Sequence, residues 1–178
     1  AISLADQAVM IGLLTAGQAR QAVAEAEDGT IGSLSRTLLR KGLLTSWQIE
    51  RLQKNDPSGF FFGGCKVLFH LAEGTFARVY RGERQDSRQA VAIKVLRNRF
   101  VADPAAVKRF NQEAESGMKL SHENIVRIIS FGEEDKRGRV AARDRGLPLG
   151  AVVGILCPDD ASLLLRVGPN RRIARCKV

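Results

Sequence analysis

The chain has 178 residues, of which 44% are hydrophobic and 26% charged, an ordinary composition for a folded domain that excludes wholesale disorder. Its net charge of +9 suggests nucleic-acid binding until the charge is located along the chain. Residues 136–178 carry 10 basic and 3 acidic side chains, so the remainder is nearly neutral. The basic character therefore belongs to the C-terminal stretch, where solvated charge is the favoured explanation and nucleic-acid contact the less favoured one.

The cysteines and histidines exclude two further classes of protein. Cys65, Cys157 and Cys176 form no close pair and are odd in number, which predicts reduced thiols rather than a disulfide framework. His70 and His122 are too few for an expected His/Cys zinc site. No apolar run reaches the roughly 20 residues of a membrane span, and no basic-then-apolar leader opens the sequence. We expect a cytoplasmic protein without a membrane span.

A helical repeat with a period of 30 residues is predicted at the beginning of the chain. Residues 12–15 read Gly-Leu-Leu-Thr and return as residues 42–45, while Gln18 returns as Gln48. Each threonine forms a capping box with the glutamine three residues later, which satisfies free amides where a helix starts. Each glycine stands where the preceding helix would end in a left-handed residue. The predicted unit is helix, glycine stop and capped helix, used twice.

The sequence does not indicate what this helical region does. Near one face of the helix before the second glycine lie Ile31, Leu34, Leu38 and Leu39. A packed bundle is favoured over a helix-turn-helix DNA reader, because phosphate binding needs an excess of Lys and Arg. Trp47 is predicted to be a core anchor. The Asn-Asp-Pro-Ser-Gly run at residues 55–59 predicts a loop and a domain boundary.

Strands follow this loop. Val67, Phe69 and Leu71 alternate with other residues as in a half-buried strand. Two further strands are predicted at residues 78–81 and 90–96.

A helix and a last strand complete the predicted order. Asp103 caps this helix and Pro104 opens it. The apolar stripe of the helix consists of Val107, Phe110, Ala114 and Met118. Another strand is expected at residues 125–130. We predict an α+β fold with three parts: a helical region with two repeats (1–58), an antiparallel sheet with one helix (59–135), and an irregular basic tail (136–178).

The candidate chemistry lies in this second part. Residues 71–80 join two predicted strands by a turn that can lay backbone amides over a polyphosphate, although an ordinary hairpin is the favoured interpretation of this motif alone. Residues 91–94 read Val-Ala-Ile-Lys, and the Lys94 ammonium at the end of an apolar strand needs a counter-charge. Glu113 lies beside the apolar stripe of the predicted helix, where it is expected to face the sheet and pair with Lys94. Such a pair alone is more often structural than catalytic.

Four motifs in series resemble the small lobe of a protein kinase. They are the loop at 71–80, the lysine strand at 91–94, Arg-Phe-Asn-Gln-Glu at 109–113 and Leu-Ser-His-Glu-Asn-Ile-Val at 120–126. Their order and spacing are similar to those of bacterial serine/threonine kinases of the eukaryotic-like type. The resemblance covers less than half of the chain and implies a kinase-like small lobe at residues 59–135.

This resemblance implies ATP binding. Lys94 would contact the α- and β-phosphates, and Glu113 would hold Lys94 in place. Leu71, Val79 and Ala92 would cover the adenine. The implied binding set is Leu71, Ala72, Glu73, Gly74, Thr75, Phe76, Ala77, Val79, Ala92, Lys94 and Glu113. Gly74 would let the loop approach the phosphates. Alanines at 72 and 77 replace the first and third glycines of the family, and because alanine disfavours positive φ, weak ATP binding is expected.

The acids of phosphoryl transfer are not recognised in the sequence. The family orients the hydroxyl with one aspartate and holds magnesium with an asparagine and a second aspartate. Arg143 and Asp144 follow Ala142 instead of a histidine, and Leu149 stands in the place of the asparagine. Residues 130–132 read Ser-Phe-Gly without the acid. No catalytic residue or magnesium ligand is therefore assigned, and phosphate transfer by this chain alone is not expected.

The kinase pattern ends after residue 135. The fifth strand and hinge of the family are not recognised in residues 136–178, which predicts a truncated or frame-shifted reading, or a fragment of a longer gene. The missing strand would leave an open sheet edge that favours association. Two functions stay open: an ATP-binding part of a serine/threonine kinase, inactive alone, or a non-catalytic module that binds a protein partner through the helical repeats or the sheet edge. Nucleic-acid contact through the tail is a third, unfavoured one.

Overall fold

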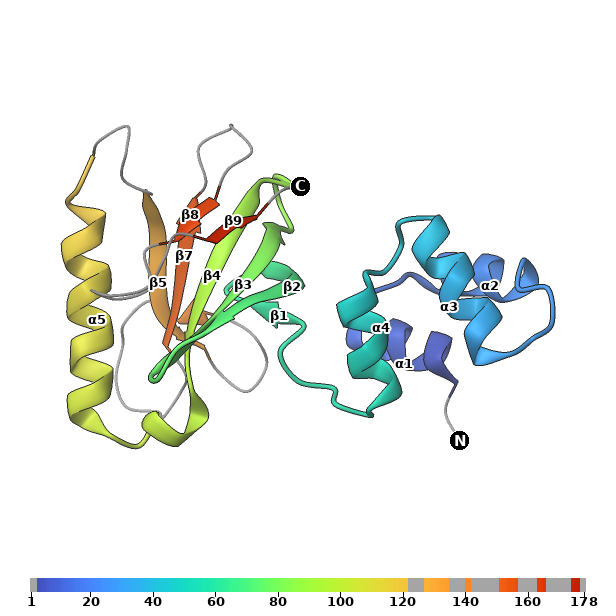
Figure 1. Cartoon of the computed structure of the whole chain (residues 1–178), viewed down its shortest axis with the longest axis horizontal. Helices are drawn as coiled ribbons and strands as arrows, with labels where there is room; N and C mark the ends of the chain where they lie inside the picture. Colours follow the sequence, from blue (N-terminus) through green and yellow to red (C-terminus); the bar gives the residue numbers. More distant parts are fainter. Residues whose placement is uncertain are drawn as a thin grey trace. The chain divides into compact units, whose positions relative to one another are not determined.

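The chain forms two compact units, Ala1–Phe61 and Phe62–Val178 (Figure 1). The computed structural model describes residues 3–121, 127–134, 140–141, 151–156, 163–165 and 174–176. Helices make up the first unit, and a sheet with one long helix dominates the second. The predicted α+β fold class is therefore confirmed. Within the described ranges, no helix has the length and apolar character that a membrane span needs.

Two helical hairpins of one design build the first unit. Its helices are α1 (Leu4–Ile11), α2 (Ala16–Ala24), α3 (Ile31–Arg40) and α4 (Ser46–Gln53). Gly12 and Gly42 follow α1 and α3 with φ values of 86° and 63°, a conformation that strains residues with a Cβ. Thr15 and Thr45 begin α2 and α4, each with a complete capping box. The predicted repeat is confirmed.

The two hairpins share a single apolar core. Helix α1 contacts both α2 and α4, and α2 contacts α3, so each hairpin uses its first helix to meet the second helix of the other. Leu38, Leu52 and Phe60 are almost completely buried. Trp47 packs edge-on against Phe60 with ring centroids 5.9 Å apart, which confirms Trp47 as a core anchor.

The buried stripe of α3 differs from the predicted one. Leu34 and Leu38 are buried as expected, but Ile31 and Leu39 are exposed. Successive helical residues are turned by about 100°, so Leu39 is rotated away from the face that Leu38 presents to the core. Ile31 is the first residue of α3, at its exposed end.

An antiparallel sheet, whose strands are not arranged in sequence order, dominates the second unit. The strand order is β1-β2-β3-β4-β7-β5-β6. The strands are β1 (Phe61–Phe62), β2 (Cys65–Glu73), β3 (Ala77–Arg84), β4 (Ala90–Leu96), β5 (Ile128–Glu134), β6 (Val140–Ala141) and β7 (Ala151–Leu156). The strands predicted around Val67, at 78–81 and at 90–96 are therefore present. The strand predicted at 125–130 begins later, at Ile128.

Strand β7 corrects the prediction of an open sheet edge. It pairs antiparallel with β4 on one side and with β5 on the other (Figure 1). The edge of β4 was expected to be open. It pairs instead with β7, which lies in the stretch where no fifth strand was recognised. A strand needs apolar, β-branched residues rather than a motif, and Ala-Val-Val-Gly-Ile-Leu meets that need. A separate pair, β8 (Leu163–Leu165) with β9 (Ala174–Cys176), follows.

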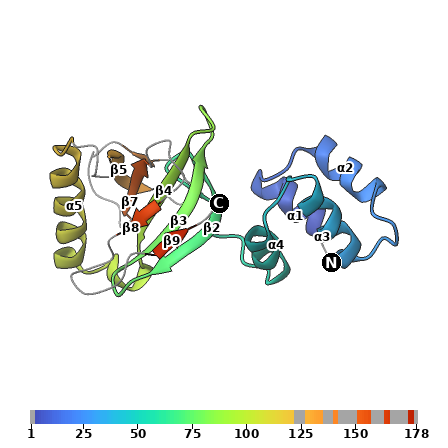
Figure 2. The ribbon, with the colours of Figure 1, turned by 45° about the horizontal axis from the view of Figure 1, so that its top comes forward.

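Helix α5 (Pro104–Met118) runs alongside β5 and β7 (Figures 1 and 2). The Asp103 side chain accepts a hydrogen bond from the Ala105 amide, and Pro104 opens the helix as predicted. The buried residues of the helix are Ala106, Phe110 and Ala114, which pack with partly buried Val107.

The last turn of α5 departs from the predicted stripe, because Met118 is exposed. Gly117 takes the position facing the sheet, and a Cβ there would overlap the side chain of Ile128 in β5. The absence of a side chain at Gly117 therefore allows the close approach of helix and strand.

Candidate functional site

The loop between β2 and β3 is a tight turn without left-handed residues. The Gly74 amide donates to the Ala77 carbonyl at 2.8 Å, which closes the turn. Ala72 pairs with Val79, and Ala77 pairs with Leu96, so both alanines belong to extended strands. The described residues with positive φ do not include Ala72, Gly74 or Ala77. We expected Ala72 and Ala77 to be unsuited to this loop because alanine disfavours positive φ. That reason is wrong, since neither position has a positive φ.

Space, rather than backbone conformation, restricts Gly74. A Cβ at this position would stand 3.3 Å from the Ala77 carbonyl oxygen, which is closer than ordinary van der Waals contact. The glycine therefore avoids a close contact with the carbonyl that closes the turn.

The predicted ion pair between sheet and helix is present. The Lys94 ammonium in β4 donates a hydrogen bond to the Glu113 carboxylate in α5 and lies 5.7 Å from the centre of the Phe110 ring. The Lys94 side chain is 23% exposed and that of Glu113 is 66% exposed. The expectation that Glu113 is turned away from solvent is therefore wrong, although its partner is the predicted one. Helix α5 presents Phe110 and Ala114 to the core, and Glu113 lies at the border of that face.

The three predicted adenine contacts lie on β2, β3 and β4, and Lys94 lies on β4. Val79 stands directly opposite Lys94 in the antiparallel register of β3 and β4, so their side chains lie on the same face of the sheet. Ala92 precedes Lys94 by two residues and shares that face. Leu71 is partly buried and lies at an irregularity in the pairing of β2 with β3. The fold thus gathers the lysine and small apolar side chains on one surface.

Glu73 and Phe76 have protein partners at the ends of the turn. The Glu73 carboxylate pairs with Arg78 at 3.2 Å and with Arg97 at 3.0 Å. The hydrogen bond from Arg78, with the nearby positive charges, holds the pKa of the Glu73 carboxyl below its ordinary value. Phe76 packs against Phe100 with ring centroids 4.8 Å apart and the ring planes tilted by 49°. Thr75, between them, is exposed.

Two arginines that the sequence did not single out contact this loop. Arg97 donates from Nη1 to the Gly74 carbonyl at 3.2 Å, and Arg99 donates from Nη2 to the Thr75 carbonyl at 3.1 Å. Arg97 directly follows β4, and Arg99 lies in the short helix η1 (Asn98–Phe100). Basic residues after a strand are common on solvated surfaces, and no spacing in the sequence marks these two.

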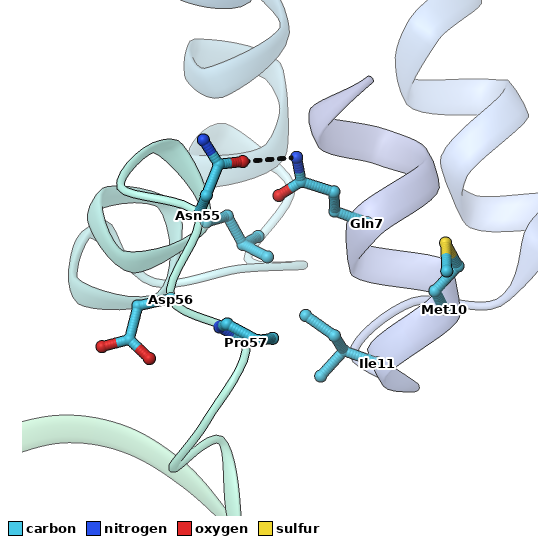
Figure 3. A pocket seen from close by; sticks show the side chains of 7 residues that line it. Gln7, Met10, Ile11, Asn55, Asp56 and Pro57 are labelled. Atoms are coloured by element: carbon cyan, nitrogen blue, oxygen red, sulfur yellow. Dashed lines mark hydrogen bonds between the residues drawn. The ribbon is translucent and has the colours of Figure 1, made fainter. Parts of the chain in front are cut away.

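The first unit contains a small apolar pocket between α1 and the end of α4 (Figure 3). Its volume is about 240 Å³, and its lining consists of Gln7, Met10, Ile11, Leu52, Asn55, Asp56 and Pro57. The Gln7 side-chain amide donates to the Asn55 side-chain oxygen at 3.1 Å across one end. Asp56 pairs with Arg51 at 2.7 Å. The pocket offers shape and apolar surface, with no pair of groups suited to acid–base chemistry among its lining residues.

Several predicted positions lie outside the described residues. These include the end of the 120–126 motif, Cys157, and Arg143 with Asp144. Ser130, Phe131 and Gly132 lie in β5, as expected of a strand that precedes any catalytic loop. Within the described residues, no group of three His, Cys, Asp or Glu side chains could hold a metal ion.

Comparison with known proteins agrees with this geometry. Residues 65–140 match the family model described as protein tyrosine and serine/threonine kinase. The chain is similar to the serine/threonine-protein kinase PrkC of Bacillus subtilis, with 40% identity over 73 residues, 41% of this chain and 11% of that protein. It is also similar to the probable serine/threonine-protein kinase PknB of Lactococcus lactis, with 42% identity over 69 residues, 38% of this chain and 11% of that protein. The chain thus spans only 11% of the length of either relative.

Among solved structures, the chain is similar to a mutant kinase domain of PknI from Mycobacterium tuberculosis. The TM-score is 0.42 and the sequence identity 23%, and the match covers 59% of this chain and 37% of that one. The family model and the curated relatives agree on the class that residues 65–140 resemble, which is the small lobe of a protein kinase. More particularly, the relatives that this part of the chain resembles are bacterial serine/threonine kinases.

Proposed function

We propose that the second unit binds ATP and that the 178 residues alone do not transfer its phosphate. The observation that carries the proposal is the hydrogen-bonded pair of Lys94 and Glu113. An ammonium has three N–H donors, and Glu113 accepts one, so donors remain for phosphate oxygens. Glu113 would hold Lys94 in place, and the face around Val79 and Ala92 would cover the adenine.

The charge and size of the residues at the site support the proposal. Lys94 is partly buried but reachable, at 23% exposure, which suits a cation that must meet a ligand anion. Val79 and Ala92 are small and apolar, as a planar purine requires. When bound, ATP supplies the phosphoryl group of kinase chemistry, and these residues bind and orient it. Magnesium accompanies ATP in the family, but no residue of this sequence is assigned as its ligand.

A titration with ATP, with and without magnesium, tests the binding proposal. The unchanged chain is expected to bind saturably, and Lys94→Ala to bind at least about tenfold more weakly, because hydrogen bonds to charged groups contribute about 1.5–3 kcal/mol. Lys54→Ala is the matched control, since it removes the same charge from the first unit. No binding by the unchanged chain would contradict the proposal. Phosphotransfer that depends on Lys94 would contradict its second half.

A non-catalytic protein-interaction module is the alternative function. The duplicated hairpin and its apolar pocket favour it, since neither contributes to nucleotide binding. Under this alternative, the chain binds no ATP and the kinase-like unit acts as a folded platform. A failed ATP titration with a chain that is shown to be folded would place this alternative first. A cytoplasmic location remains a prediction under both.

A further inference from the structure

The loop that would cover the phosphates is bonded to the segment that follows β4. The Arg97 backbone amide donates to the Phe76 carbonyl at 2.9 Å, and its Nη1 donates to the Gly74 carbonyl at 3.2 Å. Arg99 donates from Nη2 to the Thr75 carbonyl at 3.1 Å. The carbonyls of three successive loop residues thus accept hydrogen bonds from two arginines.

Charge and ring contacts reinforce these bonds. Arg97 also pairs with the Glu73 carboxylate at 3.0 Å, and its side chain is only 23% exposed. The Arg99 guanidinium lies 4.8 Å from the centre of the Phe100 ring, and Phe100 in turn packs against Phe76. Arg109 of α5 lies over Phe76 at 5.3 Å. The tip of the loop is therefore contacted by both an aromatic ring and guanidinium groups.

The direction of these bonds fixes the direction of the loop amides. In a trans peptide the C=O of one residue and the N–H of the next point in opposite directions, and no peptide bond in the described residues is cis. Because the carbonyls of Gly74 and Thr75 point at the arginines, the N–H groups of Thr75 and Phe76 point away from them. An anion can approach these amides without displacing an arginine. Successive backbone N–H groups directed to one side form the kind of concavity that binds phosphate.

We propose that Arg97 and Arg99 are positioning residues, which hold the loop so that the amides of Thr75 and Phe76 are presented to the phosphates of a nucleotide. The inference rests on the proposed ATP-binding function of the same loop. A loop with glycine at every turn position pays a large entropic cost when a ligand orders it. This turn has a single glycine, and the arginines order it before the ligand arrives, so both features lower the entropic cost of binding.

Amide hydrogen exchange without nucleotide tests the ordering step. Peptides that carry the hydrogen-bonded amides of Gly74 and of residue 97 are compared in the unchanged chain, Arg97→Gln and Arg99→Gln. A hydrogen bond of ordinary strength corresponds to a change of about tenfold, so exchange in these peptides should accelerate about tenfold in either variant. Arg84→Gln is the matched control: it removes an arginine of β3 that pairs with Asp86, away from the loop. Arg99 is the second variant in case the less exposed Arg97 is needed for folding.

Affinity for ATP and for adenosine separates positioning from general destabilisation. The loop amides act on phosphates, so Arg97→Gln and Arg99→Gln should weaken ATP binding about fivefold and change adenosine binding less than twofold. Equal losses for both ligands, or an unchanged ATP affinity despite faster exchange, would overturn the positioning role. Unchanged exchange would overturn the ordering step itself. Should the unchanged chain bind no ATP, the proposed function fails, while accelerated exchange in the variants would still support the ordering of the loop by arginines.

Discussion

Lys94 of β4 donates a hydrogen bond to Glu113 of α5, and this contact ties the sheet of the second unit to its helix. The two residues differ in their surroundings, since Lys94 is 23% exposed and Glu113 is 66% exposed. The lysine therefore depends on its partner more than the glutamate does. A partner that is well solvated contributes little to folding, but it can still determine where the ammonium points.

Glu113→Gln is expected to separate binding from stability. The free energy of unfolding should change by less than about 1 kcal/mol, because exposed ion pairs contribute little. ATP affinity should fall several-fold, because the Lys94 ammonium loses the carboxylate that orients it. Thermal unfolding and ATP titration of the same preparations measure the two effects. Glu115→Gln, on the same helix, is the control; an equal loss of affinity in that variant would show that helix charge, rather than the pair, is responsible.

Two helical glycines are expected to respond to alanine in opposite directions. Gly117→Ala should destabilise the second unit by about 1 kcal/mol, because the overlap of the new methyl group with the Ile128 side chain outweighs the helix propensity that alanine adds. Gly17→Ala should stabilise the first unit by about 0.5–1 kcal/mol, since it lies in α2 with no closer neighbour than the Thr15 hydroxyl at 3.9 Å. Denaturant unfolding followed separately for each unit measures both. A stable Gly117→Ala variant would mean that α5 can move away from β5 at little cost.

The two capping boxes allow a comparison of identical roles in different surroundings. Gln18 and Gln48 both accept a hydrogen bond from the backbone amide of their N-cap threonine, at 2.9 Å in each case. Gln18 is exposed, whereas Gln48 is fully buried. Gln18→Ala should cost no more than about 1 kcal/mol. Gln48→Ala should cost about 2–4 kcal/mol, because it adds a buried void to the lost bond. Equal costs would show that the void collapses.

Acid is expected to loosen the loop through Glu73. Its lowered pKa means that the unfolded chain binds the proton more readily than the folded one, so stability rises with pH across this titration. The contribution of Glu73 is complete above the ordinary glutamate pKa of about 4.3 and is lost as the pH falls through the lower pKa of the folded state. The groups that act on it are Arg78, Arg97 and His70. Thermal unfolding of the unchanged chain and Glu73→Gln should therefore differ at pH 6 and converge in strong acid, and a constant difference would contradict this.

Local sequence signals predicted the first unit in detail. Gly12, Gly42 and the two Thr/Gln pairs each determine a helix end by interactions within a few residues, and such interactions do not depend on the rest of the fold. The ion pair of Lys94 with Glu113 was also predictable, because an apolar strand and an amphipathic helix have readable periods. In α3, however, Ile31 and Leu39 show that an apolar pattern alone does not decide which side of a helix meets the core.

Contacts between distant segments were not predictable. The hydrogen bonds from Arg97 and Arg99 to the loop depend on how a turn and a short helix come together. No periodicity in the sequence marks an arginine that makes such a contact. Strand β7 was missed for a related reason: its residues are apolar but follow no clear alternation or family motif, and the sequence does not show with which strands they pair. The expectation that Ala72 and Ala77 need a positive φ was wrong, because β2 extends through Ala72 and β3 begins at Ala77.

The position of β7 has a consequence for the order in which the second unit forms. Strand β4 ends at Leu96 and β5 begins at Ile128, yet each pairs with β7, which begins at Ala151. A chain growing from its N-terminus therefore exposes the apolar edge of β4 until the last of these three strands has been synthesised. Pairings that close late favour slow folding and transient association. During synthesis, the ribosome and any chaperone that binds the nascent chain would therefore meet β4 as an unpaired hydrophobic strand, because its partner lies more than fifty residues further along the chain.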